Sequence, residues 1–548
     1  MNSLKPMLLS SLKSYDKSQF FKDVTAGIIV AIIALPLSIA LALASGVGPE
    51  AGIFTAIVAG FVISALGGSS VQIAGPTAAF ATIVAGIVAH DGMDGLIVAT
   101  ILAGIFLILM GLCHFGSLIK FIPFTITTGF TSGIAVTIVI GQLKDFFGLT
   151  YPTGVKPIET VEKFEAVINN FSTINMDAVI VGGVSLAILI IAPYIFKRIP
   201  GSLLAVIAGI LMVQLLPLKV NTIGNLYTIS NALPTLHFPS LSLNRIQNAL
   251  PNALTIAVLA PIESLLSCVV ADGMVNGKHR SDMELVAQGA GNIASALFGG
   301  IPATGAIART AANIKNGGRT PIAGMVHSIT LVIVLVVLMP YAGMIPMPTI
   351  AAILFIVAYN MCQWRTFVNL VKTAPKSDII VLVTSFGLTV IFDLVVAIEV
   401  GMVLACLLFI KRMSEETKVN GWTYVDDDTP DVDEHLQKLP LQIRVYEISG
   451  PLFFGAASVI EEIAVKDFTK CLVLRMRSVP ALDSTALNAL KDLVQVCESK
   501  GITIVFSHVN NQPMKVMEKA GFIELVGKEN FQLNISAALD RAEEIIHK

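Results

Sequence analysis

Long apolar runs, separated by short polar breaks, fill the first three quarters of the chain. Most of them have the ~20 residues that a helix needs to cross a hydrocarbon core about 30 Å thick. Lys22 precedes the first run and Arg412 follows the last, so the positive-inside rule predicts that both ends of this region lie in the cytoplasm. We predict fourteen spans, two of them short, at residues 24–43, 50–66, 77–90, 94–113, 117–143, 178–194, 201–217, 250–270, 284–298, 305–313, 321–340, 346–360, 377–392 and 394–411.

The apolar runs stop near residue 412, where the charge balance also changes sign. Residues 1–412 carry 22 Lys and Arg against 17 Asp and Glu, whereas residues 413–548 carry 14 against 21. In the second part, strand-like and helix-like segments alternate, which predicts a small α/β domain. We therefore predict four regions: a cytoplasmic N-terminal segment (1–23), a transmembrane domain (24–412), an acidic linker (413–438) and a soluble cytoplasmic domain (439–548).

The composition supports a polytopic membrane protein. Hydrophobic residues make up 54% of the 548 residues and charged residues 14%, against about 25% charged in ordinary soluble proteins. The mean hydropathy is +0.79, which excludes a soluble enzyme, a disordered chain and a coiled coil. A net charge of −2 gives no sign of nucleic-acid binding, and six scattered cysteines form neither a disulfide framework nor a zinc motif.

The two short runs follow segments of unusual sequence. Residues 67–77 read GGSSVQIAGPT, and residues 299–305 read GGIPATG. Each segment starts with a Gly-Gly pair, contains a proline and opens a short helix, and each precedes the third run of its half. Paired interruptions of this kind are the best sequence indication of a transporter's binding site.

A helix that starts in the middle of a membrane directs unpaired N–H groups and a partial positive charge into the protein. Two such helix ends, facing each other, make an anion site without any lysine. An ordinary re-entrant loop or a helix kink is the alternative interpretation. The predicted contributors of hydroxyl or backbone groups are Thr77, Ala78, Thr304, Gly305 and Ala306, and Gln72 is a further predicted substrate-binding residue.

Ionisable residues inside membrane runs are rare and costly, so each is a functional candidate. Glu263 lies in an otherwise uncharged run with Ser267 on the same helix face, and it can carry a proton or serve a structural role. Arg309, close to the start of the second short helix, can pair with Glu263 or attract the anion. Glu399, one turn into the last run, is better explained by pairing or by reaching toward the interface.

These motifs resemble the bacterial branch of the sulfate permease (SulP) anion transporters, and the resemblance covers essentially the whole chain. In the first half it rests on Gln72 with Gly75-Pro76-Thr77. The C-terminal part resembles a STAS domain, with Asp483-Ser484-Thr485 at that family's Asp-Ser-Ser/Thr loop. The longest stretches that carry the resemblance are residues 261–266, 270–274, 278–280, 287–289, 291–293, 298–310 and 317–321.

The resemblance implies a seven-plus-seven inverted repeat with two half-helices, a core and a gate sub-domain, an elevator-like motion and a homodimer in the bacterial cytoplasmic membrane. Ser484 and Thr485 open a predicted helix, where a hydroxyl can cap the helix or be a site of regulatory phosphorylation. We also expect a cytoplasmic protein partner at the STAS domain. Sodium-coupled bicarbonate carriers of the family have aspartate at the place of Glu263 and threonine at that of Ser267. This chain departs from them and is similar to the proton-coupled members, so we expect H⁺ as the coupling ion in preference to Na⁺, and no cofactor.

Other function classes remain open at this stage. A nucleobase–proton symporter shares the fold, but Arg309 and the STAS domain argue against it. An anion exchanger, an anion channel and a membrane sensor that signals through the STAS domain are the other readings. No nucleophile–base set and no phosphate-binding loop is visible, which excludes an enzyme and an ATP-driven pump. We predict secondary active transport of a sulfate, dicarboxylate or bicarbonate anion.

Overall fold

The computed structural model describes residues 4–117, 122–152, 157–195, 200–239, 242–392, 394–422, 439–463 and 468–547. Its internal contacts divide the chain into two compact units, residues 1–402 and 403–548. The first unit corresponds to the predicted transmembrane domain, and the second contains the predicted soluble domain.

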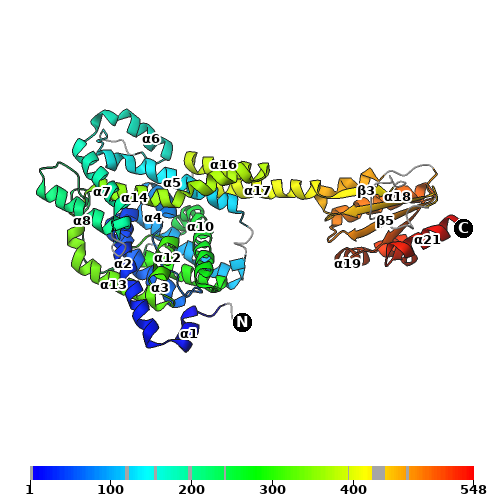
Figure 1. Cartoon of the computed structure of the whole chain (residues 1–548), viewed down its shortest axis with the longest axis horizontal. Helices are drawn as coiled ribbons and strands as arrows, with labels where there is room; N and C mark the ends of the chain where they lie inside the picture. Colours follow the sequence, from blue (N-terminus) through cyan, green and yellow to red (C-terminus); the bar gives the residue numbers. More distant parts are fainter. Residues whose placement is uncertain are drawn as a thin grey trace. The chain divides into compact units, whose positions relative to one another are not determined.

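The first unit is helical (Figure 1). Two very short strands, β1 (Ala74–Gly75) and β2 (Thr304–Gly305), interrupt the helices. The helices are α1 (Met7–Ser11), α2 (Lys17–Ala44), α3 (Pro49–Leu66), α4 (Ala78–Leu112), α5 (Phe124–Phe147), α6 (Thr160–Asn169), α7 (Met176–Ile195), α8 (Gly201–Leu215), α9 (Ile223–Leu226), α10 (Leu243–Val275), α11 (Ser281–Leu297), α12 (Ile307–Lys315), α13 (Ile322–Ala342), α14 (Met347–Cys362), α15 (Trp364–Thr373), α16 (Lys376–Ile391) and the first part of α17 (Leu394–Glu415).

Each of the fourteen predicted runs overlaps a helix. Two of the runs, 77–90 and 94–113, fall on the two halves of α4, which Gly92 separates with a left-handed φ of +70°. Within the described residues, eight helical segments are long and apolar enough to cross a membrane by length and composition. The number of actual crossings therefore stays a prediction.

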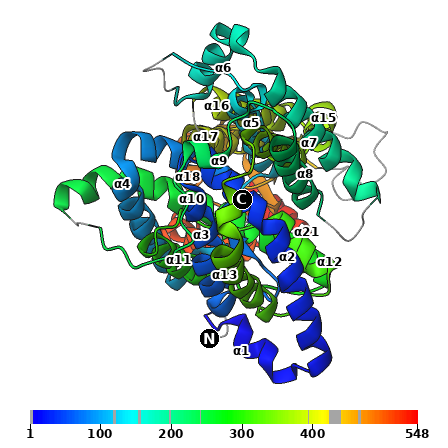
Figure 2. The ribbon, with the colours of Figure 1, turned by 90° about the vertical axis from the view of Figure 1, so that its left-hand side faces the viewer.

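The helices of the first unit form two groups. In one, α2, α3, α4, α10, α11, α12 and α13 pack against one another; in the other, α5, α7, α8, α14 and α16 do. Figure 2 shows α5, α7, α8 and α16 gathered on one side and α3, α11, α12 and α13 on the other. These groups match the core and gate sub-domains that the sequence resemblance implies. The two interrupted segments, residues 67–77 and 299–305, belong to the core and are called the first and second broken segments.

Small residues bring the core helices close together. A side chain at Gly104 of α4 or at Gly289 of α11 would collide with the backbone carbonyl of the other residue. Without a hydrophobic driving force between helices in lipid, close approach of this kind supplies van der Waals contact instead. It holds α11 directly against α4, behind the first broken segment.

The predicted N-terminal segment, 1–23, runs into the first long helix earlier than expected, because α2 begins at Lys17. Asp23 of α2 is fully buried. Its carboxylate accepts hydrogen bonds from the hydroxyl of Thr320 (2.6 Å) and the backbone N–H of Arg319 (2.9 Å). This contact ties the start of α2 to the loop between α12 and α13.

The second unit is a mixed five-stranded sheet with helices on both faces. Strands β4, β5, β6 and β7 pair in parallel, and β3 adds to β4 antiparallel. Alternate residues of β5 face opposite sides: Leu472 and Leu474 pack with α18, and Val473 packs with α21. The elements are β3 (Lys418–Trp422), β4 (Ile443–Ser449), η5 (Phe454–Glu462), β5 (Cys471–Ser478), α18 (Ser484–Ser499), β6 (Thr503–Ser507), α19 (Asn511–Lys519), α20 (Phe522–Val526), β7 (Phe531–Gln532) and α21 (Ile535–His547).

Strand β3 corrects the predicted linker. Residues 418–422 were expected to belong to a linker at 413–438, but they form an edge strand whose backbone pairs with β4. The sequence KVNGW is too short and too polar to be recognised as a strand without its partner, which is 25 residues further along the chain. The acidic run itself falls at 423–438, outside the described residues.

Candidate functional site

The two broken segments meet inside the core. Strands β1 and β2 pair antiparallel, with Ala74 opposite Gly305 and Gly75 opposite Thr304. The N–H of Ala306 also donates to the carbonyl of Ile73 at 2.9 Å. Each strand leads within three residues into a helix, α4 or α12, so the amino-terminal ends of these helices lie beside each other. This is the arrangement that the paired Gly/Pro breaks predict.

The predicted threonines are in direct contact. Thr304 is fully buried, and its hydroxyl donates to the hydroxyl of Thr77 at 3.1 Å. Thr77 is the residue before α4, in extended conformation, and is only partly buried. The two hydroxyls thus link the helix starts of the two halves.

The unpaired backbone donors differ in part from those expected. The N–H of Gly305 donates to the Ser264 hydroxyl (3.1 Å), and that of Ala306 is used by Ile73, so neither is available to a ligand. In the described part of the chain, no protein acceptor pairs with the N–H groups of Ala78, Ile307 and Ala308. The reason is that α12 begins at Ile307, two residues later than predicted, and a helix leaves only its first-turn N–H groups unpaired.

Arg309 joins the two segments. Its side chain is 2% exposed, and its guanidinium donates to the carbonyl of Pro76 in the first segment. A side chain at Gly75 would collide with the guanidinium, so the glycine permits this close approach. Nε and Nη1 of Arg309 have no hydrogen-bond partner among the described residues. Two donors of a buried cation are therefore unsatisfied.

Of the two roles that the sequence leaves open for Arg309, an ion pair with Glu263 is not observed. Among the described residues, no ion pair involves either side chain. Glu263 is partly buried on α10, next to Ser264, whose hydroxyl binds the second segment. Ser267 lies one turn further and donates to the Thr310 hydroxyl at 3.5 Å, at the limit of a hydrogen bond. Helix α10 thus contacts the second segment through Ser264 and helix α12 through Ser267.

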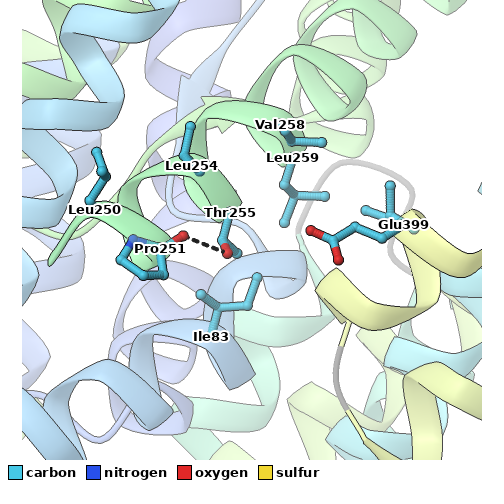
Figure 3. A pocket seen from close by; sticks show the side chains of 9 residues that line it. Ile83, Leu250, Pro251, Leu254, Thr255, Val258, Leu259 and Glu399 are labelled. Atoms are coloured by element: carbon cyan, nitrogen blue, oxygen red, sulfur yellow. Dashed lines mark hydrogen bonds between the residues drawn. The ribbon is translucent and has the colours of Figure 1, made fainter. Parts of the chain in front are cut away.

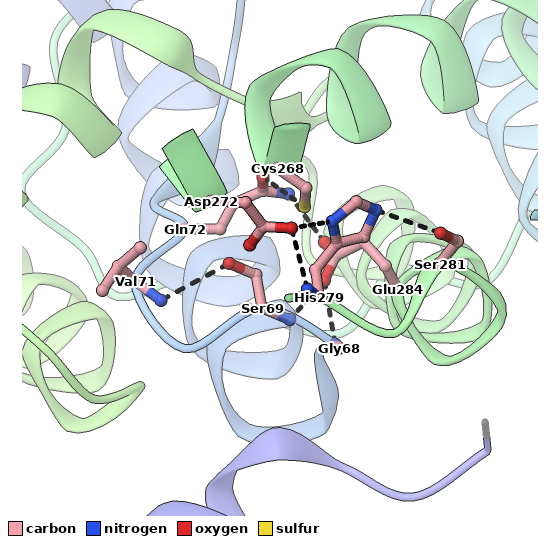
Figure 4. Close-up of polar contacts among 9 residues, drawn as sticks. All are labelled: Gly68, Ser69, Val71, Gln72, Cys268, Asp272, His279, Ser281 and Glu284. Atoms are coloured by element: carbon pink, nitrogen blue, oxygen red, sulfur yellow. Dashed lines mark hydrogen bonds and ion pairs between the residues drawn. The ribbon is translucent and has the colours of Figure 1, made fainter. Parts of the chain in front are cut away.

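Gln72 is held inside a buried polar network (Figure 4). Its amide nitrogen donates to Glu284 at 2.6 Å, and its amide oxygen accepts from the thiol of Cys268 at 2.9 Å. The side chain lies directly against Gly305, where a Cβ atom would collide with it. Gln72 therefore connects the two segments, and its amide groups are engaged with protein partners.

Glu284 is the functional candidate that the sequence reasoning missed. The predicted runs 250–270 and 284–298 leave Glu284 at the first position of a span, whereas α11 begins at Ser281 and has Glu284 within its first turn. The spacing of Glu284, Gln288 and Asn292 at four-residue intervals was the available signal, because it marks one face of a helix. All three side chains are fully buried.

Comparison with known proteins agrees with the family resemblance of the sequence motifs. The model of the sulfate permease family matches residues 20–385, and the STAS domain model matches residues 437–541. The chain belongs to the sulfate permease family. It is 38% identical over 530 residues to the putative sulfate transporter YvdB of Bacillus subtilis, covering 95% of this chain and 97% of that protein. It is 31% identical over 541 residues to the bicarbonate transporter BicA of a Picosynechococcus species, covering 95% and 94%.

A solved structure agrees with the fold over the whole chain. The murine anion transporter Solute Carrier 26 family member A9 has a TM-score of 0.88 with this sulfate permease chain, covering 99% of this chain and 94% of that one. At 19% identity, this similarity concerns the fold alone. The prediction of a polytopic helical membrane protein with a C-terminal STAS domain is confirmed. So is the prediction that the chain is a transporter and not an enzyme, because its relatives are transporters.

A cavity of about 320 Å³ lies between α4, α10 and α17 in this sulfate permease chain. Its walls are mostly apolar, and Glu399 is its one acidic residue. The Glu399 carboxylate is exposed and points toward Thr255 and Leu259 of α10 (Figure 3). Both of these lie on the amino-terminal side of Glu263, so Glu399 lines a different part of α10 from the broken segments.

In the STAS domain, Asp483 caps α18. Its carboxylate accepts from the N–H of Ala486 (2.9 Å) and from that of Phe454 (2.8 Å). A hydroxyl of Ser484 or Thr485 does not cap this helix, because Asp483 occupies the cap position. Ser484 and Thr485 lie exposed in the first turn. Their predicted regulatory role stays a prediction.

Proposed function

We propose that this protein is a secondary active transporter that moves a small anion of the sulfate, bicarbonate or dicarboxylate class together with a proton. The observation that carries the proposal is the state of Arg309. A buried guanidinium with two unsatisfied donors and no acidic partner in the described residues leaves a positive charge that an anion would neutralise.

The backbone supports the same ligand. The unpaired N–H groups of Ala78, Ile307 and Ala308 belong to the first turns of two helices whose amino-terminal ends adjoin. An oxyanion can accept from these N–H groups and from Nε and Nη1 of Arg309, with the Thr77 hydroxyl adding a further donor. The donor set recognises oxygen atoms and negative charge, and it suits an inorganic oxyanion as well as a carboxylate.

The substrate class follows from the relatives only as a proposal. Two of them are named as transporters of sulfate and of bicarbonate, and both match this chain over nearly its whole length. Sulfate and bicarbonate differ in size and charge, and both present several acceptor oxygens. A dicarboxylate is the third member of the proposed class.

Glu263 is the proposed coupling residue. Its carboxylate is partly buried, makes no hydrogen bond or ion pair with a described residue, and lies on α10 next to the serine that binds the second segment. An ionised carboxylate near a bound anion is disfavoured by like charge, so anion and proton should bind together. After both are released, the empty carrier can return with Glu263 ionised.

We further propose that the core moves relative to the gate in an elevator-like cycle, that two copies form a homodimer, and that the chain lies in the bacterial cytoplasmic membrane with both termini in the cytoplasm. The grouping of helices into core and gate supports the first of these. The STAS domain, following α17, would then face the cytoplasm, where a protein partner can reach Ser484 and Thr485.

An anion exchanger, a channel and a sensor are the competing functions. Purified protein in liposomes, with labelled sulfate, bicarbonate and a dicarboxylate tested in turn and an imposed pH gradient, separates them. Saturable uptake above equilibrium, driven by outside acid, supports symport. Flux that requires an anion on the opposite side indicates exchange, non-saturating flux without proton movement indicates a channel, and binding without flux indicates a sensor.

A further inference from the structure

Helix α11 carries a buried polar face that contacts both broken segments. Near its start, Glu284 binds the first segment; two turns later, Asn292 binds the second. Asn292 accepts from the N–H of Ala303 (2.8 Å) and donates to its carbonyl (2.9 Å). Eight residues along a helix correspond to about 12 Å, so one rigid element fixes both segments at a set separation.

Glu284 satisfies four donors at once. One carboxylate oxygen accepts from the backbone N–H groups of Gly68 (2.9 Å) and Ser69 (3.2 Å). The other accepts from the side-chain amides of Gln72 (2.6 Å) and Gln288 (2.9 Å). An ionised carboxylate only accepts hydrogen bonds, and a shell made entirely of N–H donors fits that form.

The charge of Glu284 works against anion binding. A carboxylate buried in the same core as the proposed anion site repels an anion, and a low-dielectric surrounding strengthens that repulsion. Glu284 therefore favours anion binding only if its effect on the position of the first segment outweighs its charge repulsion. Because these two effects change the affinity in opposite directions, a neutral substitution distinguishes them.

The geometric effect passes through Gln72. Glu284 orients the Gln72 amide, and that amide lies against Gly305. Gly305 is also the residue of β2 that pairs with Ala74 of β1. The β1–β2 pairing itself spans only two residues on each side, and an isolated ladder this short is at most marginally stable in water. Outside support is needed to keep the helix ends of α4 and α12 in register.

We propose that Glu284 is a positioning residue of the anion site: without touching the anion, it holds the first broken segment in register with the second through Gln72. The expected effect of Glu284 on anion affinity rests on the proposed function. Its expected effect on the order of the two segments rests on the described contacts alone, so the two effects are measured separately.

The first measurement needs no ligand. Hydrogen exchange is followed at residues 68–76 and 300–306 in full-length wild-type protein and in Glu284→Gln, both free of substrate anions. Because the amide has one acceptor oxygen in place of two, we expect faster exchange in both segments. Glu399→Gln, the same substitution in a cavity that no residue of the two segments lines, is the matched control and should leave both unchanged. Unaltered exchange at 300–306 in Glu284→Gln overturns the proposal, whether or not any anion binds.

The second measurement is the affinity of the same proteins for sulfate and bicarbonate. Positioning predicts that Glu284→Gln weakens binding by about tenfold, although it removes a negative charge. Tighter binding would mean that charge dominates, and equal binding would mean a purely structural role; either result overturns the proposal. If the wild-type protein binds no anion of the proposed class, the proposed function is wrong. The hydrogen-exchange measurement then decides by itself whether Glu284 holds the segments.

A reciprocal variant covers the case in which Glu284→Gln does not fold. In Gln72→Glu with Glu284→Gln, the amide at 284 keeps an oxygen for Gly68 and Ser69 and offers its nitrogen to the new carboxylate at 72. The oxygen of Gln288, which has no partner among the described residues, can turn toward position 284. Folding and slow exchange restored in the double variant support the proposal, and failure of the double variant as well as the single one counts against it.

Discussion

The hydroxyls of Thr77 and Thr304 are 3.1 Å apart, although 227 residues separate them in the chain. Each residue stands just before a helix that starts inside the core. Their contact places the two halves of the molecule around one centre, with Arg309 reaching across from the second half to the carbonyl of Pro76 in the first.

Arg309→Gln should weaken anion binding by about 1–3 kcal/mol, roughly 5- to 150-fold in Kd, because it removes the charge and two unsatisfied donors of a buried group. Titration of purified protein with labelled sulfate or bicarbonate measures this. Arg365→Gln, at an exposed position of the same unit, is the matched control and should bind normally. Equal affinity of Arg309→Gln and wild type would make Arg309 structural.

Glu263→Gln imitates the protonated carboxyl. It should keep anion binding, and exchange of labelled for unlabelled anion, yet lose accumulation driven by a pH gradient, because no proton can be released or taken up. Uptake into liposomes with acid outside is the measurement. The comparison variant, Glu399→Gln, should accumulate like wild type.

Two results would contradict this coupling scheme. Wild-type accumulation by Glu263→Gln would show that another group carries the proton, and Glu399, in its apolar cavity on the other part of α10, would be tested next. Uptake by wild type that depends on sodium in place of a pH gradient would reject the proton itself.

Removing the STAS domain should leave anion binding intact, because the described site lies wholly in the first unit. The structure fixes where to cut: α17 ends at Glu415, and β3 needs β4 as its partner. A chain lacking residues 417–548 should bind the anion with unchanged affinity. A chain lacking only 439–548 keeps β3 as an unpaired strand and should aggregate more readily. Loss of binding in the well-folded shorter chain would refute the division of labour.

The STAS domain cysteines should be unreactive at neutral pH. Burial raises the pKa of the Cys471 thiol to about 12 and that of Cys497 to about 11, so the reactive thiolate is scarce. Alkylation of native protein at pH 8, followed by mass spectrometry of the peptides, should modify exposed Cys113 and spare both. Modification of Cys471 at the rate of Cys113 would show that its strand opens.

The raised pKa values of these two thiols also predict that the STAS domain loses stability at alkaline pH. The folded-state pKa values lie above the ordinary value of 9.0, so the stability that these thiols contribute is complete below pH 9. It is lost as the pH rises from 9 through 11 and 12, where the unfolded chain ionises first. Cys497→Ala should reduce this loss, as followed by unfolding of the full chain at pH 8 and pH 10.5.

The sequence by itself determined the elements of this protein and the places where they break. Apolar runs of span length, the Gly-Gly and proline interruptions before Thr77 and Thr304, and the alternation of strands and helices after residue 439 are all local patterns. Hydrophobic periodicity and backbone restrictions act within one or two turns, so a single chain segment carries the information. The family resemblance then supplied the expected grouping into core and gate.

Only the tertiary structure decided which groups are free to act. The N–H groups of Gly305 and Ala306 donate to Ser264 and Ile73. Arg309 donates to the carbonyl of Pro76 and does not pair with Glu263. Glu284 is a buried helical residue that accepts hydrogen bonds from the first segment. β3 becomes a strand only beside β4. The physical reason is common to all of these: a polar group's role depends on the partner that satisfies it, and here most of those partners come from distant parts of the chain.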